Sequence, residues 1–228
     1  MRDSTIVCFV GVDGSGKSTL SRSLYEELRK QKYDVTYTWW LEAESSVFRK
    51  GIRGLFNTSG ENLNKLAHEP SPRNRSSLAN GLLKLYPWAV ILDYLGFGIM
   101  KTRIPCRRGS KRILLFDRYY FDTIFALCQE FDIPDNTRES LVKIFRIFVP
   151  DPDILYVIDV PPEISHSRKP EEILSIQNAR ALWENQQNVN NFIISKLENT
   201  QIFRMDNSGD LDRMEKRILL HTLKYLRS

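Results

Sequence analysis

The sequence predicts an α/β fold in which helices cover a parallel β-sheet, and three features of the chain lead to this expectation. Short apolar runs alternate with helix-like patterns along its length, as in successive β-α-β units. Several of these runs are apolar at consecutive positions, which is typical of strands buried on both faces of a sheet. The 228 residues, 42% of them hydrophobic, are enough for one good core. We therefore expect one domain over residues 1–228, with insertions.

Five runs are expected to form the strands: Thr5 to Val10, Asp34 to Trp40, Arg112 to Phe116, Ile154 to Ile158 and Gln201 to Met205. A helix is expected over Ser18 to Lys32. Its Leu20, Leu24 and Leu28 recur at the spacing of one helix face. A closing helix is expected over Leu211 to Leu226. The predicted layers are helices, a five-stranded sheet and helices.

The connection between the second and third expected strands is about 70 residues long, too long for an ordinary loop, so residues 45–110 are expected to form a helical insertion. Its centre, Asn57 to Asn80, is polar and rich in proline and arginine, which predicts a mobile loop between helical pieces. Trp88 to Met100 is strongly apolar but shorter than the about 20 residues of a spanning helix. We expect a buried core helix there and no membrane contact.

Net charge and cysteine content say more about the cellular compartment of the protein than about its ligand. Thirty-three Lys and Arg residues against 28 Asp and Glu give a net charge of +5, which suits anionic ligands of any kind. The basic stretch Lys101 to Arg112 has no aromatic interleaving, so we expect a solvated turn and no specific nucleic-acid binding. Cys8, Cys106 and Cys128 lack the spacing of a disulfide framework or a zinc site, and no targeting segment is visible. A reducing, cytoplasmic setting is expected.

The stretch GVDGSGKST matches the Walker A pattern and stands between an expected strand and an expected helix, as the pattern requires. Its glycines let backbone N–H groups turn toward phosphate oxygens, and the helix N-terminus adds its dipole. We expect the whole stretch to bind a nucleotide: Gly11, Val12, Asp13, Gly14, Ser15, Gly16, Lys17, Ser18 and Thr19. Lys17 would reach the β- and γ-phosphates, and the Ser18 hydroxyl would bind Mg²⁺.

A second motif, LLFDRYYFDT, places an acidic residue at the end of a buried strand. Asp117 therefore has the position of a Walker B carboxylate, beside the phosphates and close to the metal. Arg118 follows at the same edge of the sheet, and its planar guanidinium suits a phosphate that must be held and aimed. A surface ion pair at a strand end is the alternative explanation of the two residues.

GVDGSGKST and the downstream FDRYYFDT together resemble the thymidylate kinase group of P-loop nucleoside monophosphate kinases, which pair a G-x-D-G-x-G-K-[ST]-T loop with a D-R-[YH] signature. The resemblance implies a three-layer P-loop NTPase fold in which residues 45–110 bind the acceptor and residues 163–180 form a lid. It also implies ATP and Mg²⁺ as cofactors, a nucleotide substrate and a homodimer.

A third stretch, Asp159 to Ile173, looks like the family segment in which a strand leads to an arginine-bearing lid. Such arginines stabilise the charge on the transferring phosphoryl group. The phosphate-binding loop here carries no arginine, so the resemblance assigns this role to Arg168, with Lys169 and Arg180 as further candidates. An ordinary polar helix end before Pro170 is the alternative.

The resemblance also implies contacts to both nucleotides. It assigns Asp13 to the sugar hydroxyl of the acceptor, although an aspartate in a turn can instead cap neighbouring N–H groups. Asp206 and Asn207, after the fifth expected strand, lie where the family contacts adenine.

Two departures from the family pattern leave the acceptor open. Val10 stands where thymidylate kinases usually carry a glutamate, and no R-E-P-G-G stretch follows the second strand, which ends in Trp39-Trp40-Leu41-Glu42. The aromatic side chain that stacks on the acceptor base is therefore not assigned, and core packing is the alternative for each candidate. These candidates are Tyr86, Trp88 and Tyr94, and the arginines that could hold the acceptor phosphate are Arg53, Arg73 and Arg75.

The predicted activity is transfer of the γ-phosphoryl group of Mg-ATP to a nucleoside monophosphate, with dTMP as the first candidate. Lys17, Arg118 and Arg168 are the expected catalytic residues. Ser18 and Asp117 are expected to bind the metal, and Asp13, Asp117 and Arg118 the acceptor. Two alternatives stay open. One is a nucleoside or other small-molecule kinase on the same scaffold, and the other is a P-loop ATP-binding switch protein.

Overall fold

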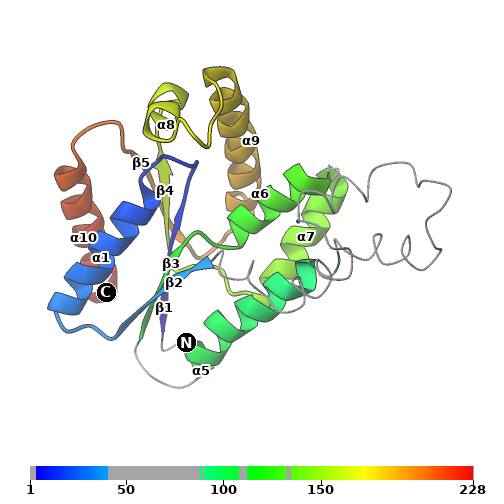
Figure 1. The fold of residues 1–228 in the computed structure, drawn as a ribbon. Coiled ribbons are helices and arrows are strands. Elements are labelled where there is room, and N and C mark those ends of the chain that lie inside the picture. The colour runs from blue at the N-terminus through cyan, green and yellow to red at the C-terminus, as the bar shows by residue number, and fades with distance from the viewer. Residues whose placement is uncertain (1–3, 41–87, 89, 108–111, 132–134, 228) are drawn as a thin grey trace, which may run out of the picture.

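The computed structural model describes residues 4–40, 88, 90–107, 112–131 and 135–227. They contain a parallel sheet whose five strands lie in the order β2-β3-β1-β4-β5 (Figure 1). The strands are β1 (Thr5–Val10), β2 (Val35–Trp39), β3 (Ile113–Asp117), β4 (Ile154–Asp159) and β5 (Gln201–Asp206). The predicted parallel sheet is confirmed. One shift in bounds matters for the site, because β3 begins after Arg112 and includes Asp117.

Helices cover both faces of this sheet (Figure 1). On one face α1 (Lys17–Lys30) packs against α10 (Leu211–Arg227). On the other face α6 (Tyr120–Phe131) contacts both α7 (Asp135–Phe148) and α9 (Ile176–Ile194). The short α8 (Pro162–Arg168) lies beyond the carboxyl end of β4.

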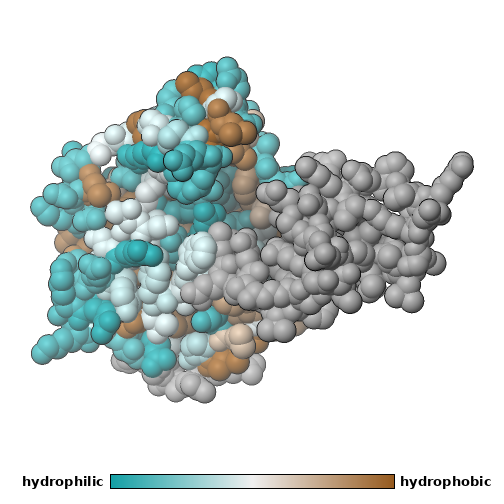
Figure 2. Space-filling view, viewed as in Figure 1, coloured by the Kyte–Doolittle hydropathy of each residue, from teal (hydrophilic) through white to brown (hydrophobic). Residues whose placement is uncertain are grey.

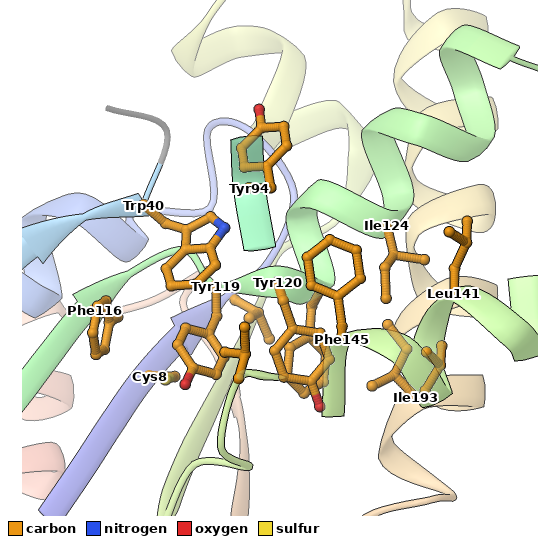
Figure 3. Packing of buried hydrophobic residues seen from close by; sticks show 14 of the residues in the cluster. Cys8, Trp40, Tyr94, Phe116, Tyr119, Tyr120, Ile124, Leu141, Phe145 and Ile193 are labelled. Atoms are coloured by element: carbon orange, nitrogen blue, oxygen red, sulfur yellow. The ribbon is translucent and has the colours of Figure 1, made fainter. Parts of the chain in front are cut away.

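The core is divided by the sheet into two clusters, and β1 contributes to both. Its side chains alternate in direction, as strand geometry requires. Ile6, Cys8 and Val10 belong to the cluster beneath α6, α7 and α9, whereas Val7 and Phe9 belong to the one beneath α1 and α10. All are fully buried, which explains the consecutive apolar run in the sequence. Figure 3 shows the aromatic part of the first cluster, with Trp40, Phe116, Tyr119 and Tyr120.

The helix expected over Trp88 to Met100 is present, but only one of its faces is buried. Within residues 90–98, Val90 and Tyr94 lie in the core, whereas Leu92 is exposed. The packing is close: a Cβ atom at Gly98 would come within 3.1 Å of the Trp40 ring. Tyr94 is therefore a core residue, in line with the alternative given for it. Among the described residues, no helix is long and apolar enough to span a bilayer.

The basic stretch Lys101 to Arg112 differs from the solvated turn that we expected. Its first part continues the preceding helix as a π-helical segment (Ile99–Arg103) and then as α5 (Ile104–Arg107). Nε of Arg103 donates to the Phe148 carbonyl at 2.8 Å, and Nη2 donates to the Ile147 carbonyl. These carbonyls belong to the last turn of α7, where a cation is favoured by the helix dipole. Arg103 therefore joins two helices.

Candidate active site

The loop between β1 and α1 has a backbone that only glycine suits at several points. Gly14 and Gly16 adopt positive φ angles of 79° and 85°, which side chains disfavour. At Gly11 the reason is steric, because an added Cβ atom would lie 2.1 Å from the Ile158 carbonyl oxygen of β4. The glycine spacing of the Walker A pattern is thus required by the loop geometry itself.

The N-terminus of α1 is arranged as an anion site. Gly16 is its N-cap, and no side chain of the described residues caps the first turn. The Ser15 hydroxyl is buried and has no hydrogen-bond partner within the described part of the chain. Backbone N–H groups and a helix dipole that no side chain has neutralised favour a bound phosphate. The loop therefore fits the nucleotide phosphates predicted for it.

Lys17 is almost fully buried, with 3% of its surface exposed. Its Nζ donates to the Val12 carbonyl at 3.0 Å and to Oδ1 of Asp13 at 3.1 Å. Burial lowers the pKa of Lys17, and the Arg118 cation lowers it further. One carbonyl and one carboxylate thus hold the ammonium beside the loop, and its three N–H donors leave one for a phosphate oxygen.

The Asp13 carboxylate contacts both Lys17 and Arg118. Its Oδ1 also accepts a hydrogen bond from Nη2 of Arg118. Burial alone would raise the pKa of Asp13, but Lys17 and Arg118 outweigh it and lower the pKa to about 2. The carboxylate is therefore ionised at neutral pH and holds the two cations side by side.

Arg118 has a backbone conformation that is rare for a residue with a side chain. Its φ is +69°, and its N–H donates to the Phe9 carbonyl at the end of β1, at 2.9 Å. Strained residues of this kind are held by the surrounding structure and cluster at functional sites. The turn after β3 thus directs the guanidinium toward Asp13 of the phosphate-binding loop.

Asp117 ends β3 and is buried, with 2% of its surface exposed. Tyr37 Oη donates to its Oδ2 at 3.1 Å, whereas Oδ1 has no hydrogen-bond partner among the described residues. A buried carboxylate oxygen without a donor is unfavourable unless a ligand occupies it. Mg²⁺ prefers oxygen ligands, so Asp117 and the Ser18 hydroxyl fit the predicted metal.

Asp122 and Gln186 belong to the site although the sequence analysis did not select them. Gln186 Nε2 donates to the Gly11 carbonyl at 3.1 Å and to Oδ1 of Asp122 at 3.3 Å. The same Oδ1 lies 3.6 Å from Nη1 of Arg118. Asp122 could have been noticed, because it lies four residues after Arg118 in one motif. Gln186 gives no sequence signal, since it belongs to an ordinary polar run of α9.

The pH dependence of stability should reveal Asp122. Burial raises its pKa from 3.8 to about 6, although Arg118 and Lys17 oppose this. A raised pKa means that the protonated form stabilises the fold at low pH and that this contribution is lost as pH rises through about 6. Relative to wild type, Asp122→Asn should gain on the order of 2 kcal/mol in free energy of unfolding between about pH 4 and pH 7.5. Urea unfolding at several pH values measures this.

Asp13→Asn is the matched control for that experiment, because its pKa of about 2 places its titration below the window. The contribution of the Asp13 carboxylate to stability is present above pH 3.8 and is lost as pH falls through about 2. The difference between this variant and wild type should therefore change much less over the window than the difference for Asp122→Asn. Parallel pH profiles for wild type and Asp122→Asn would contradict the assignment to Asp122.

Helix α8 packs directly against the phosphate-binding loop. Ser165 Oγ donates to the Asp13 carbonyl at 2.6 Å. Arg168, at the end of α8, donates from Nη1 to the Gly14 carbonyl at 3.2 Å and from Nη2 to the Asn207 carbonyl at 3.0 Å. Its guanidinium therefore bridges this loop and the turn after β5. In contrast, Lys169 pairs with Glu172 and Arg180 with Glu163, both on the exposed surface.

Exposed apolar side chains follow Arg168 along the chain. Leu174 has 81% of its surface exposed, and Ile176 at the start of α9 has 40%. Figure 2 shows hydrophobic atoms near the top of the molecule, over α8 and the beginning of α9, among largely hydrophilic neighbours. The segment between α8 and α9 thus exposes apolar side chains, whereas those of the central strands are buried.

The turn after β5 also reaches the phosphate-binding loop. Asn207 is buried, and its Nδ2 donates to the Ser15 carbonyl at 2.8 Å. Its backbone N–H donates to the Asp159 carbonyl at 2.8 Å. Asn207 therefore lies beside the phosphate-binding loop.

Several predicted acceptor residues lie outside the described residues: Arg53, Arg73, Arg75 and Tyr86, together with the loop over Asn57 to Asn80. Trp88 is described and has 57% of its surface exposed. The structure thus brings together the phosphate-binding loop, Asp117, Arg118 and Arg168, whereas the base of the acceptor is not assigned to any aromatic residue.

A parallel sheet with a Walker A loop after β1, a carboxylate at the end of the adjacent β3 and helices on both faces defines a P-loop α/β nucleotide-binding protein. No family model matches the chain. A thymidylate kinase of Leptospira borgpetersenii is 27% identical over 166 residues, 71% of this chain and 66% of that protein. A probable thymidylate kinase of Thermococcus onnurineus is 29% identical over 163 residues, 69% and 67% of the two chains.

A probable thymidylate kinase of Sulfolobus acidocaldarius is likewise 28% identical over 163 residues, 72% of this chain and 68% of that protein. By these matches and by its motifs, the chain is similar to thymidylate kinases. The matched region spans about two thirds of the length of each relative.

Proposed function

We propose that this protein is a nucleoside monophosphate kinase that transfers the γ-phosphoryl group of ATP to dTMP and releases dTDP and ADP. The relatives are named as thymidylate kinases, which supports dTMP as the acceptor. The geometry of the site is more direct support than these names, and it favours transfer between two phosphate groups.

One observation carries the proposal: Oδ1 of Asp13 accepts hydrogen bonds from both Lys17 and Arg118. Lys17 belongs to the donor-phosphate loop, and Arg118 follows the strand that ends at Asp117. Two phosphate-binding cations on one carboxylate oxygen are close enough to hold a donor and an acceptor phosphate in contact. Placing reactants in this way supplies much of the catalysis in phosphoryl transfer.

In the proposed reaction Lys17 holds the β- and γ-phosphates and Arg118 holds the acceptor phosphate. Asp13 orients the two cations, and in the bound state it accepts a hydrogen bond from the sugar hydroxyl of the acceptor. Arg118 is also 3.6 Å from Asp122, so its guanidinium is fixed from two sides before substrate arrives. A fixed cation costs little reorganisation when charge develops in the transition state.

Arg168 is proposed to stabilise the transferring group, with residues 163–180 acting as the lid. Its two hydrogen bonds to backbone carbonyls of Gly14 and Asn207 keep it at the edge of the loop. Neutral carbonyls bind a guanidinium less strongly than a phosphate does, so the side chain can exchange them for phosphate oxygens when ATP is present. Residues 45–110 are proposed to contribute the acceptor-binding insertion.

Mg²⁺ bound by Ser18 and Asp117 would neutralise charge on the nucleotide phosphates. Asp206 and Asn207 are proposed to lie beside the adenine. We further propose a homodimer in the cytoplasm. The family resemblance supports the dimer, and a reducing compartment is supported by three cysteines that form no disulfide, Cys8, Cys106 and Cys128.

Product mass after incubation with Mg-ATP and single acceptors tests the function. The acceptors are the common ribo- and deoxyribonucleoside monophosphates and thymidine, with an acceptor-free control. We expect rapid, selective formation of dTDP from dTMP. If ADP formed at the acceptor-free rate with every compound, the kinase assignment would be wrong and a P-loop switch would fit better.

A further inference from the structure

Tyr37, in β2, makes a contact with the metal-site carboxylate that no motif of the sequence indicates. Its Oη donates to Oδ2 of Asp117 at 3.1 Å and lies 3.4 Å from the Ser21 hydroxyl. Ser21 is fully buried in α1, and its Oγ donates to the Ser18 carbonyl at 3.2 Å. Each hydroxyl has one proton, so with Tyr37 donating to Asp117 the Ser21 hydroxyl donates either to Tyr37 Oη or to the Ser18 carbonyl.

Strand pairing explains why Tyr37 reaches this place. β2 runs parallel to β3, with Tyr37 level with Leu115 and Trp39 level with Asp117. The Tyr37 side chain lies on the α1 face, where its ring packs against Tyr25 with centroids 5.6 Å apart. A long side chain that starts two residues before the strand end can extend its hydroxyl to the carboxylate at that end. Packing on Tyr25 restricts the ring, so the hydroxyl position is restricted too.

The two oxygens of Asp117 have different environments. Oδ2 has the Tyr37 hydroxyl as donor, whereas Oδ1 is buried with no hydrogen-bond partner in the described part of the chain. A phenol is protonated at neutral pH, so the Tyr37 hydroxyl acts as the donor to this carboxylate. A donor on one oxygen fixes the rotation of the carboxylate and leaves the other oxygen for a cation or its bound water.

We propose that Tyr37 is a positioning residue for Asp117: by holding Oδ2 it presents Oδ1 to the magnesium of the bound nucleotide. This inference rests on the proposed donor site. Groups that orient a metal ligand commonly change metal affinity by about 10- to 100-fold when removed. Tyr37→Phe keeps the ring and its contact with Tyr25 but removes this hydroxyl.

Binding of Mn²⁺ in the presence of a non-hydrolysable ATP analogue, followed by electron paramagnetic resonance, tests the proposal without turnover. Tyr37→Phe should weaken Mn²⁺ binding about tenfold or more. Tyr25→Phe is the matched control, because Tyr25 is the neighbouring ring. Its hydroxyl accepts a hydrogen bond from Nη1 of Arg29 at 3.2 Å, on the exposed surface. This variant should leave Mn²⁺ affinity unchanged. Thermal unfolding of both variants checks that the fold is retained.

The effect must also depend on Asp117. In an Asp117→Asn background, the further change Tyr37→Phe should alter Mn²⁺ affinity less than twofold, since a double-mutant cycle isolates interactions between the pair. Unchanged Mn²⁺ affinity in a folded Tyr37→Phe variant would overturn the proposal while leaving the donor site intact. An equal loss in both backgrounds would overturn it as well. Failure of wild type to bind Mn²⁺ with the nucleotide would instead overturn the donor site and the proposal together.

Discussion

Lys17→Ala is expected to lower kcat/KM for ATP by about 100-fold or more, because it removes a buried cation aimed at the charge of the transferring phosphate. The ammonium is positioned by Val12 and Asp13 at 3.0 and 3.1 Å and is shielded from water, so its electrostatic effect is not screened as on the surface. A coupled assay of ADP release at saturating dTMP measures the loss.

Two further variants separate chemistry from folding in this experiment. Lys17→Met fills most of the volume of the lysine stem without its charge and should be as inactive as Lys17→Ala. Lys30→Ala removes a cation from the last turn of the same helix, where it is exposed and pairs with Glu27 at 2.5 Å. It should retain wild-type activity, as exposed pairs contribute little. Full turnover in a folded Lys17→Met variant would show that the donor phosphates bind elsewhere.

Local patterns predicted the parallel sheet and the glycine positions of the loop after β1, and the reason is physical. β1 shows a consecutive apolar run because both of its faces are buried, and the loop needs glycine at Gly14 and Gly16 because their φ angles are positive. Each requirement is met by residues that are close together in the sequence, so a short sequence pattern indicates it. The strand order, by contrast, was not predictable from periodicity, because it depends on how distant segments pair.

Contacts between distant segments account for what the sequence did not reveal about the site. Tyr37 and Asp117 are 80 positions apart, and Gln186 reaches Gly11 across 175. Neither side chain is unusual for its own element: Tyr37 suits a strand, and Gln186 suits a polar helix face. Their roles arise only when parallel pairing and helix packing bring them to the carboxyl edge of the sheet. Arg168 was chosen by resemblance, and its contacts with Gly14 and Asn207 could not be inferred from spacing.

Arg118→Ala is expected to lower kcat/KM for dTMP by about 100-fold or more, with a much smaller effect on ATP binding. The guanidinium can hold a phosphate with two parallel hydrogen bonds, which no other residue type reproduces. Its loss also removes the cation between Asp13 and Asp122 and leaves Lys17 as the partner of Asp13, so an incoming phosphate would meet less positive charge. Arg118→Lys keeps the charge without the fork and should fall between wild type and alanine. Initial rates over a range of dTMP concentrations measure each variant.

The positive φ of Arg118 makes it possible to separate the side chain from the backbone. Glycine adopts a φ of +69° freely, whereas alanine does not, so Arg118→Gly should be more stable than Arg118→Ala by about 1 kcal/mol. If the guanidinium binds the acceptor phosphate, the two variants are equally inactive toward dTMP despite this difference in stability. Recovery of activity in Arg118→Gly alone would mean that the alanine defect comes from backbone strain, and the acceptor role of Arg118 would then be wrong. Equal losses, together with unequal free energies of unfolding, would assign the turn after β3 two independent tasks: holding a strained backbone against β1 and presenting a cation to the acceptor.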